Sequence, residues 1–258
     1  MMVVSKISGV LLLIILALFS ACAGPVDEKR SQVSLSLSAL SGFSAKEMGS
    51  RYFDRAMSYQ DSRFEAISLT EIASAESFEG ADALLLDCRD DYEGVVSLAD
   101  IRDFDLHMAT KIMLKPGIAA PDWLQAGLIL VPDHIKAPFQ ERFVTANVRT
   151  IRSINLDEYY RPLHEAVRKK PEYLKALQTY KDNCLFCHSL GSVGGKKGGG
   201  LLEKFRFEKE EGRRAFAVAF IQFHNQGNMD KQNMEQFVSP HMLSDLAGFL
   251  YYMEGLSH

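Results

Sequence analysis

Hydrophobic and polar positions follow two patterns along the chain, and the change comes near Pro171. Before it, three stretches have the apolar or alternating pattern of strands: residues 81–88 (ADALLLDC), 126–132 (AGLILVP) and 143–154 (FVTANVRTIRSI). Two stretches have helical spacing, residues 44–60 and 103–114. Mixed elements of this kind predict an α+β domain over residues 33–165.

Beyond Pro171 the pattern is helical throughout. Residues 172–188 place Leu174, Leu177, Tyr180, Cys184 and Cys187 along one helix face. Residues 210–223 form a second, mostly apolar helix, and a third begins with Ser239 as the cap and Pro240 as its first residue.

These helices predict an all-α domain over residues 171–258, so the expected fold class is two-domain, an N-terminal α+β domain followed by an all-α domain. Three short helices around the glycine-rich stretch GGKKGGG enclose too small a core to be stable alone. We therefore expect a non-protein group to fill that core.

The N-terminus has the features of an export signal. Lys6 precedes an apolar run that ends in small residues and Cys22. The sequence FSAC resembles the lipobox of bacterial lipoproteins, although Phe19 stands where leucine is more usual. The resemblance implies a signal peptide over residues 1–21, lipid on Cys22 and a tether over residues 22–32.

An uncleaved transmembrane anchor is the alternative, because the apolar run approaches the length of about 17 residues that a span needs. Either way the rest of the chain lies outside the cytoplasm, facing the periplasm. The residue after Cys22 is Ala23 and not the aspartate associated with inner-membrane retention, which favours the outer membrane slightly.

Composition excludes one class of function. The apolar fraction of 47% is that of an ordinary globular protein, and the net charge of −4 provides no basic field for nucleic acid. Four cysteines, Cys22, Cys88, Cys184 and Cys187, leave no disulfide if Cys22 is lipidated and the close pair is otherwise engaged.

The pair Cys184 and Cys187, followed at once by His188, has the CxxCH spacing of c-type haem attachment. One helical turn separates the cysteines, so both sulfurs can reach the vinyl groups on one haem edge, and the imidazole lies over the haem face. A thioredoxin-like site would favour a βαβ setting, and a zinc site would need two further ligands at paired spacing. A haem is the better interpretation.

From about Glu172 to Leu256, roughly a third of the protein, the chain resembles a class I cytochrome c domain. Beyond CxxCH, the resemblance rests on Ala176 and Tyr180 in the first helix, Phe249 in the last helix and the glycine-rich residues 198–205, where the usual proline is missing. It implies one covalent haem c, with thioether bonds to Cys184 and Cys187 and with His188 as an iron ligand.

The second iron ligand implied by the resemblance is Met234, in a loop before the last helix, with Phe237 as the aromatic that follows it. Glu235 replaces the family's proline. The alternatives are four: Met229, Met242, His224 and His241. A methionine ligand would raise the reduction potential relative to a second histidine.

The N-terminal half faintly resembles part of a sulfite-oxidase-like molybdopterin domain, at an aspartate-x-tyrosine turn in DDYEGVVSLADI. The molybdenum-binding cysteine of that family has no counterpart here. The resemblance therefore implies a domain without a cofactor that serves as a docking or scaffold module. We interpret Cys88 as a small buried apolar residue. His107, Met108 and His134 form no recognisable catalytic set.

These features predict a membrane-anchored monohaem cytochrome that transfers single electrons to or from a redox protein in the periplasm or envelope. A molybdenum-containing oxidoreductase is one candidate partner. Iron held on both faces leaves no open position for substrate, so we expect an electron carrier rather than an enzyme. The alternatives are a redox enzyme that uses the haem as electron outlet, and a haem-based gas sensor.

Overall fold

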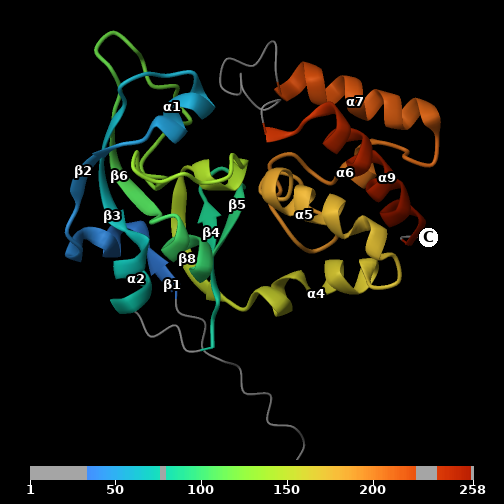
Figure 1. The fold of residues 1–258 in the computed structure, drawn as a ribbon, viewed down its shortest axis with the longest axis horizontal. Coiled ribbons are helices and arrows are strands. Elements are labelled where there is room, and N and C mark those ends of the chain that lie inside the picture. Colours follow the sequence, from blue (N-terminus) through green and yellow to red (C-terminus); the bar gives the residue numbers. More distant parts are fainter. Residues whose placement is uncertain (1–33, 76–79, 225–236, 257–258) are drawn as a thin grey trace, which may run out of the picture. The chain divides into compact units, whose positions relative to one another are not determined.

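The computed structural model describes residues 34–75, 80–224 and 237–256. Within these residues, eight strands form two four-stranded antiparallel sheets (Figure 1). The first has the order β1-β8-β4-β5, with bounds β1 Ser34–Ser36, β8 Val148–Ile154, β4 Ala83–Cys88 and β5 Glu93–Ser97. The second has the order β2-β3-β6-β7, with bounds β2 Lys46–Gly49, β3 Arg63–Ser68, β6 His107–Met113 and β7 Leu128–Leu130.

Short helices connect the strands and longer ones follow them. The helices of the sheet region are α1 Arg51–Met57, α2 Leu69–Ala75, α3 Leu98–Asp103 and the 3-10 helices η2 Leu37–Gly42 and η3 Glu141–Val144. After β8 come α4 Leu156–Val167, η4 Pro171–Tyr173, α5 Leu174–Asn183, α6 Leu201–Lys204, α7 Glu210–His224 and α9 Pro240–Leu256. Among the described residues, no helix is both long and apolar enough to cross a membrane.

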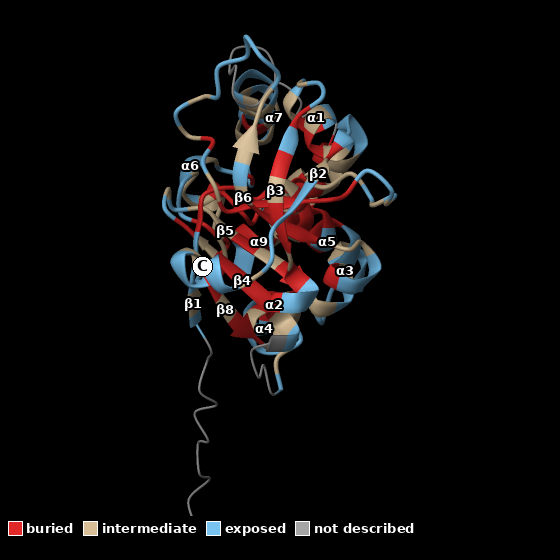
Figure 2. Ribbon diagram, turned by 90° about the vertical axis from the view of Figure 1, so that its left-hand side faces the viewer, coloured by how far each residue is buried: buried red, intermediate tan, exposed pale blue. Residues whose placement is uncertain are grey.

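The main core of the sheet region lies between the two sheets. Leu84 and Leu86 of β4 face Met108 of β6 and Ile129 of β7 in one cluster of buried residues. The opposite face of β4 is buried as well, because Leu85 packs in a second cluster under α4. Burial on both faces explains the nearly continuous apolar run of β4, and Figure 2 shows β4 and β8 largely buried.

The strands expected at 81–88 and 126–132 are confirmed as β4 and β7. The strand expected at 143–154 is confirmed only over β8, because η3 covers residues 143–144. The helix expected at 103–114 is wrong, because that segment begins at the end of α3 and continues as β6. β6 pairs with β3 on one side and β7 on the other. These long-range pairings outweigh the helical propensity of its Met, Ala and Lys residues. The segment 44–60 is helical only over α1, and β2 precedes it.

The expected fold class, an α+β domain followed by a separate all-α domain, is wrong. Gln32–His258 is one compact α+β unit in which two antiparallel sheets and the helices occur together. The cluster of buried residues around Tyr180 contains Ala56 of α1, and Val95, Phe139 and Val144 pack against it. The few C-terminal helices do not enclose a core alone, and they complete it against the sheet region.

Candidate functional site

The cysteines and histidine of the CxxCH motif lie on a single turn that follows α5. Backbone bonds join Cys184 N–H to the Tyr180 carbonyl at 2.8 Å and His188 N–H to the Cys184 carbonyl at 2.8 Å. The turn thus continues helical geometry past Asn183 and keeps Cys184, Cys187 and His188 together. Neither Cys184 nor Cys187 is in a disulfide.

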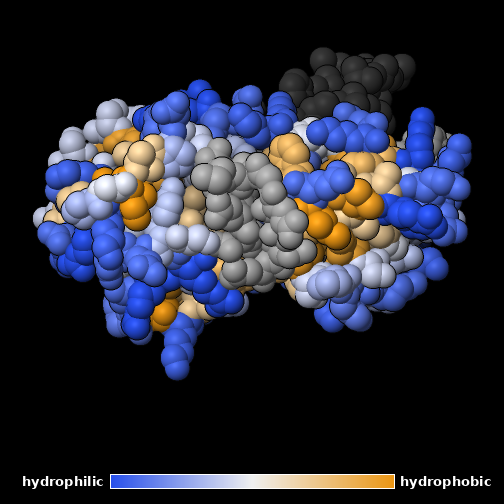
Figure 3. All heavy atoms as spheres, turned by 90° about the horizontal axis from the view of Figure 1, so that it is seen from above, coloured by the Kyte–Doolittle hydropathy of each residue, from blue (hydrophilic) through white to orange (hydrophobic). Residues whose placement is uncertain are grey.

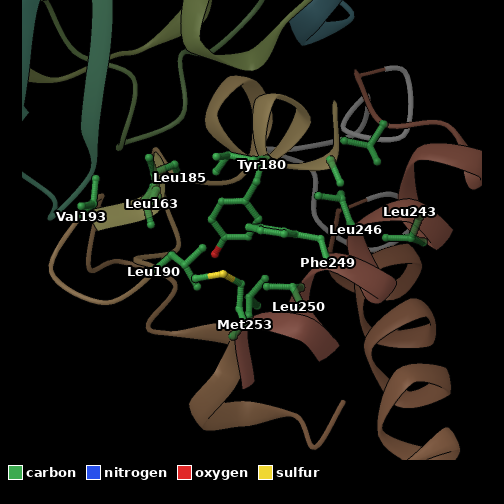
Figure 4. Packing of buried hydrophobic residues seen from close by; sticks show 14 of the residues in the cluster. Leu163, Tyr180, Leu185, Leu190, Val193, Leu243, Leu246, Phe249, Leu250 and Met253 are labelled. Carbon is green, nitrogen blue, oxygen red and sulfur yellow. The ribbon is translucent and has the colours of Figure 1, made fainter. Parts of the chain in front are cut away.

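The core beneath this turn is formed by α5 and α9 (Figure 4). The rings of Tyr180 and Phe249 meet edge to face at 6.1 Å, and both side chains are fully buried. Tyr180 also donates a hydrogen bond from its hydroxyl to the His188 carbonyl at 3.1 Å. The packing of the two helices is thereby tied directly to the position of the histidine.

The imidazole of His188 is oriented by one backbone carbonyl. Its Nδ1 lies 3.0 Å from the Gly199 oxygen, and a carbonyl can only accept, so Nδ1 carries the proton. In the neutral form of this tautomer, the ring's lone pair is on Nε2. A backbone carbonyl on the other nitrogen is the usual way in which proteins fix a histidine that binds metal.

The glycine-rich stretch packs against the CxxCH turn so closely that side chains would not fit. A Cβ atom on Gly198 would lie 2.3 Å from His188 Cε1 and 2.8 Å from Cys187 Sγ. One on Gly195 would lie 2.0 Å from the Phe186 oxygen. Gly195 and Gly198 also donate their N–H groups to the carbonyls of Leu185 and Cys187, each at 2.8 Å. The glycines therefore hold the backbone against the motif.

The sheet region contacts the same turn through the connection between β4 and β5. Tyr92 stacks on Phe186 with ring centroids 4.5 Å apart, and Glu93 N–H donates to the Phe186 carbonyl at 2.9 Å. The Asp91 carbonyl accepts the N–H groups of Lys196 and Lys197 at 2.8 and 3.1 Å. Asp90 to Tyr92 form the aspartate-x-tyrosine turn, so this turn supports the CxxCH segment.

A buried ion network forms a second joint between sheet and helices. Arg142 lies 2.6 Å from the Asp100 carboxylate and 3.2 Å from that of Asp182, and all three side chains are largely buried. Burial alone would raise the pKa of Asp100, but its bonds to Arg142 outweigh burial and lower it. Burial raises the pKa of Asp182, although Arg142 acts against the rise. Arg142 is shared by two carboxylates from different regions of the chain.

A cavity of about 500 Å³ opens beside the motif, and most of its lining is apolar. Cys184, Cys187 and His188 line it on one side, and α7 lines it on another. The α7 residues are Phe216, Ala219, Phe220, Phe223 and His224, which share one helix face. Of the residues of α7, Phe216 is buried, whereas Phe223 is 67% exposed. The cavity thus has the size and apolar character of a cofactor site.

Residues from the sheet region and from the glycine-rich stretch also line the cavity. Trp123, Val144 and Ala146 contribute apolar surface, and Asp90 and Glu141 contribute carboxylates. The indole Nε1–H of Trp123 is buried and has no hydrogen-bond partner within the described residues. Lys197 and Lys204 also line the cavity and are exposed, which places cations at its rim.

The thiol of Cys184 is unlike that of a redox nucleophile. Desolvation raises its pKa well above the ordinary value, with the nearby Glu141 carboxylate adding to the rise. Reactive cysteines in CxxC motifs instead have lowered pKa values, because the thiolate is the nucleophile. This environment disfavours a disulfide-exchange role for Cys184.

The rival iron ligands occupy different places. Met234 and Met229 lie outside the described residues, as does Cys22. His241 is exposed on α9 and pairs with Asp245 at 3.2 Å. Met242 is half-buried against the core beneath the motif. His224 lines the cavity, and its ring centroid lies 6.2 Å from that of His188.

The other residues considered from the sequence lie elsewhere. Cys88 is 3% exposed in the core between the sheets, which confirms its interpretation as a small buried residue. His107 is buried on β6 with Nδ1 at 2.7 Å from the Asp105 carbonyl, and Met108 is core. His134 is exposed and lies 3.4 Å from Asp105. Over the described ranges, no three His, Cys, Asp or Glu side chains are arranged to hold a metal ion.

Sequence reasoning missed the wall that the sheet region and α7 build. The apolar spacing of Phe216, Ala219, Phe220 and Phe223 was a usable signal, although it indicates only a helix face that needs a partner. Nothing local marks Trp123 or Val144 as neighbours of the motif. In comparison with known proteins, no family model and no curated protein matches the chain.

Proposed function

We propose that the protein is a monohaem c-type cytochrome that carries single electrons at the cell envelope. One observation carries the proposal: the CxxCH turn opens onto an apolar cavity, and Nδ1 of His188 lies at the Gly199 carbonyl. The packing of Tyr180 against Phe249 supports the resemblance to class I cytochromes c.

The residues around the cavity fit a haem c. Cys184 and Cys187 would hold it by thioether bonds, and His188 would bind iron. The face of α7 with Phe216 and Phe220 supplies apolar surface for a flat ring, and Lys197 and Lys204 supply cations for its propionates. When bound, the haem supplies a one-electron redox centre whose potential depends on its ligands and burial.

The chain's own residues would tune and shield that centre. Tyr180 and Gly199 fix the position and tautomer of His188, while Tyr92 and Phe186 close the turn against the sheet region. An acceptor on the occupant of the cavity would satisfy the Trp123 indole N–H.

The proposal also covers where a partner docks and how the protein is held at the membrane. We assign docking to residues 33–165, because Trp123, Val144 and Ala146 of this region line the cavity, so a partner bound there lies next to the haem. The partner would be a redox protein of the periplasm or envelope, molybdenum-containing oxidoreductases included. Lipid on Cys22 would hold the protein at the membrane.

The test is to produce the protein in cells with a c-type haem maturation system. We expect the purified chain to carry one covalent haem by mass and absorbance. It should be reduced and reoxidised reversibly by small redox mediators. The double variant Cys184→Ser/Cys187→Ser should carry none, and Cys88→Ala, which keeps a small buried residue in the sheet core, should carry a full complement. A wild type without covalent haem would overturn the proposal.

The same preparation separates the alternative functions. A second metal or chromophore in stoichiometric amount would indicate a redox enzyme. Rapid binding of carbon monoxide to the reduced wild type without denaturant would indicate a sensor. We expect neither, because an electron carrier needs no open coordination position.

A further inference from the structure

Two of the residues that line the cavity are histidines, and they lie close to each other. His188 comes from the turn after α5, and His224 is the last residue of α7. Their ring centroids are 6.2 Å apart with the ring planes at 77°. If ring nitrogens of the two histidines point along this line, they are too far apart for a direct hydrogen bond to each other. The space between the rings is also too short to hold both a haem and a third side chain.

That separation matches two imidazoles on opposite sides of one metal ion. An imidazole nitrogen binds a first-row metal at about 2 Å and lies about 1 Å from its ring centre, so two trans imidazoles have centroids roughly 6 Å apart. The steep angle between the planes is compatible with this arrangement, since rotation about the bond from metal to nitrogen leaves the distance unchanged.

The surroundings of His224 place it on the same face as the apolar lining. Phe220 lies one turn earlier on α7, with its ring 4.9 Å from that of His224. Phe216 and Ala219 continue this face along the helix. A ring bound between the histidines would therefore lie against an aromatic wall, and α7 would position its own last residue over it.

Among the described rivals for the second iron position, His224 alone lines the cavity. His241 is exposed beside Asp245, and Met242 packs into the core with the residues of α5 and α9. We propose that His224 is the second axial ligand of the haem iron, opposite His188, which makes the centre a bis-histidine haem. This inference rests on the proposed function and replaces Met234 in that position.

Bis-histidine ligation has a chemical consequence for the partner. A second imidazole gives a lower reduction potential than a methionine thioether. The protein would therefore match partners that work at low potential, and its iron would be closed to small ligands.

The test compares absorption, electron paramagnetic resonance and carbon monoxide binding of the holoprotein with those of three variants. We expect wild-type ferric protein to be low-spin with bis-imidazole resonance and without the weak long-wavelength band of methionine ligation. His224→Ala should become high-spin and gain carbon monoxide binding at least tenfold faster. Met234→Leu, and His241→Ala as the matched exposed histidine, should leave all signals unchanged.

His224→Met gives a second readout that requires no open site. It should raise the reduction potential and introduce the methionine band, whereas a histidine that only fills space would change neither. If His224→Ala does not mature, the wild-type resonance decides between the two ligands by itself.

Two results would overturn the inference in distinguishable ways. A methionine band in wild type that disappears in Met234→Leu, with covalent haem intact, contradicts His224 and leaves the cytochrome function standing. Absence of covalent haem from the wild type overturns both.

Discussion

The core between the sheets and the cavity beside the CxxCH turn are built from similar apolar residues but completed differently. The first contains side chains that pack against one another and are completely buried, among them Leu84, Leu86, Met108 and Ile129. In the second, the apolar face of α7 borders a cavity of about 500 Å³. Figure 3 shows apolar atoms gathered at the surface on the side that carries α7. Complete burial indicates a stability role, and an apolar wall that borders a cavity among the described residues favours a ligand.

The two cysteine environments show the same contrast. Cys88 is surrounded by the sheet core, whereas Cys184 and Cys187 line the cavity. Desolvation raises the pKa of the thiol at Cys88 and at Cys184 alike. The pKa therefore does not distinguish Cys88 from Cys184. What distinguishes them is that Cys184 lines the cavity and Cys88 does not.

The largest effect is expected from removing the buried ion network that connects the sheet region to α5. Arg142→Ala removes the shared cation and leaves Asp100 and Asp182 buried without it, which should destabilise the protein by about 3–5 kcal/mol. Urea unfolding at pH 7 measures the loss. Arg149→Ala is the control, because its pair with Asp87 is exposed and should matter by less than about 1 kcal/mol. Equal losses in both variants would contradict a buried joint.

The next effect separates packing from ligand contact. Leu86→Ala should lower the free energy of unfolding by about 2–5 kcal/mol, with or without haem, because it leaves a hole in a filled core. Phe220→Ala should cost less than Leu86→Ala in protein produced without haem, since its side chain is only partly buried and borders the cavity.

In haem-loaded protein we expect Phe220→Ala to lose markedly more stability and to shift the haem absorption. Leu86→Ala should leave the absorption unchanged. A cost of Phe220→Ala that does not depend on haem would show that α7 contacts protein alone.

A smaller effect concerns the glycine backbone against the motif. Gly198→Ala should cost about 1–3 kcal/mol and displace His188, because the added Cβ overlaps its ring and the Cys187 sulfur. Resonance spectra of the iron report the displacement. Gly200→Ala is the matched control, since its Cβ would meet only the flexible Glu203 side chain at 3.2 Å. Normal spectra in Gly198→Ala would refute the role of close packing.

The smallest effect is a dependence on pH. The folded-state pKa of Asp100 is lowered relative to its unfolded value of about 3.9, so its contribution to stability is present above that pH and lost as pH falls through the folded value. Asp100→Asn should therefore destabilise the protein more at pH 7 than at pH 3. Chemical unfolding at the two pH values measures the difference, and an equal cost at both would contradict the lowered pKa.

Local patterns predicted part of the fold well. The apolar run of β4 and the cap and proline at the start of α9 are recognisable without tertiary information, and Ser239 does cap α9 through the Met242 N–H at 3.3 Å. β6 was missed because its strand pairing is set by β3 and β7, which lie far away in the sequence. The one-unit fold was missed for a related reason. Contacts such as Tyr92 with Phe186 leave no trace in local periodicity.

The candidate site divides along the same line. CxxCH is a local motif, so its three residues could be named from the sequence alone. The approach of His224 to His188 depends on how α7 packs, and spacing along the chain does not encode it. Met234, which the family resemblance implies, lies outside the described residues and stays a prediction.

The close packing of the glycine-rich stretch also bears on whether haem attachment would come before or after folding. Gly198 lies against the Cys187 sulfur, and the turn from Asp90 to Tyr92 is fastened over the same segment. Cys187 is buried once these contacts exist. If the two cysteines hold a haem as proposed, the attachment enzyme would need the chain while it is still open. Under the proposed function, the turn from Asp90 to Tyr92 would therefore close over the motif only after both cysteines have reacted.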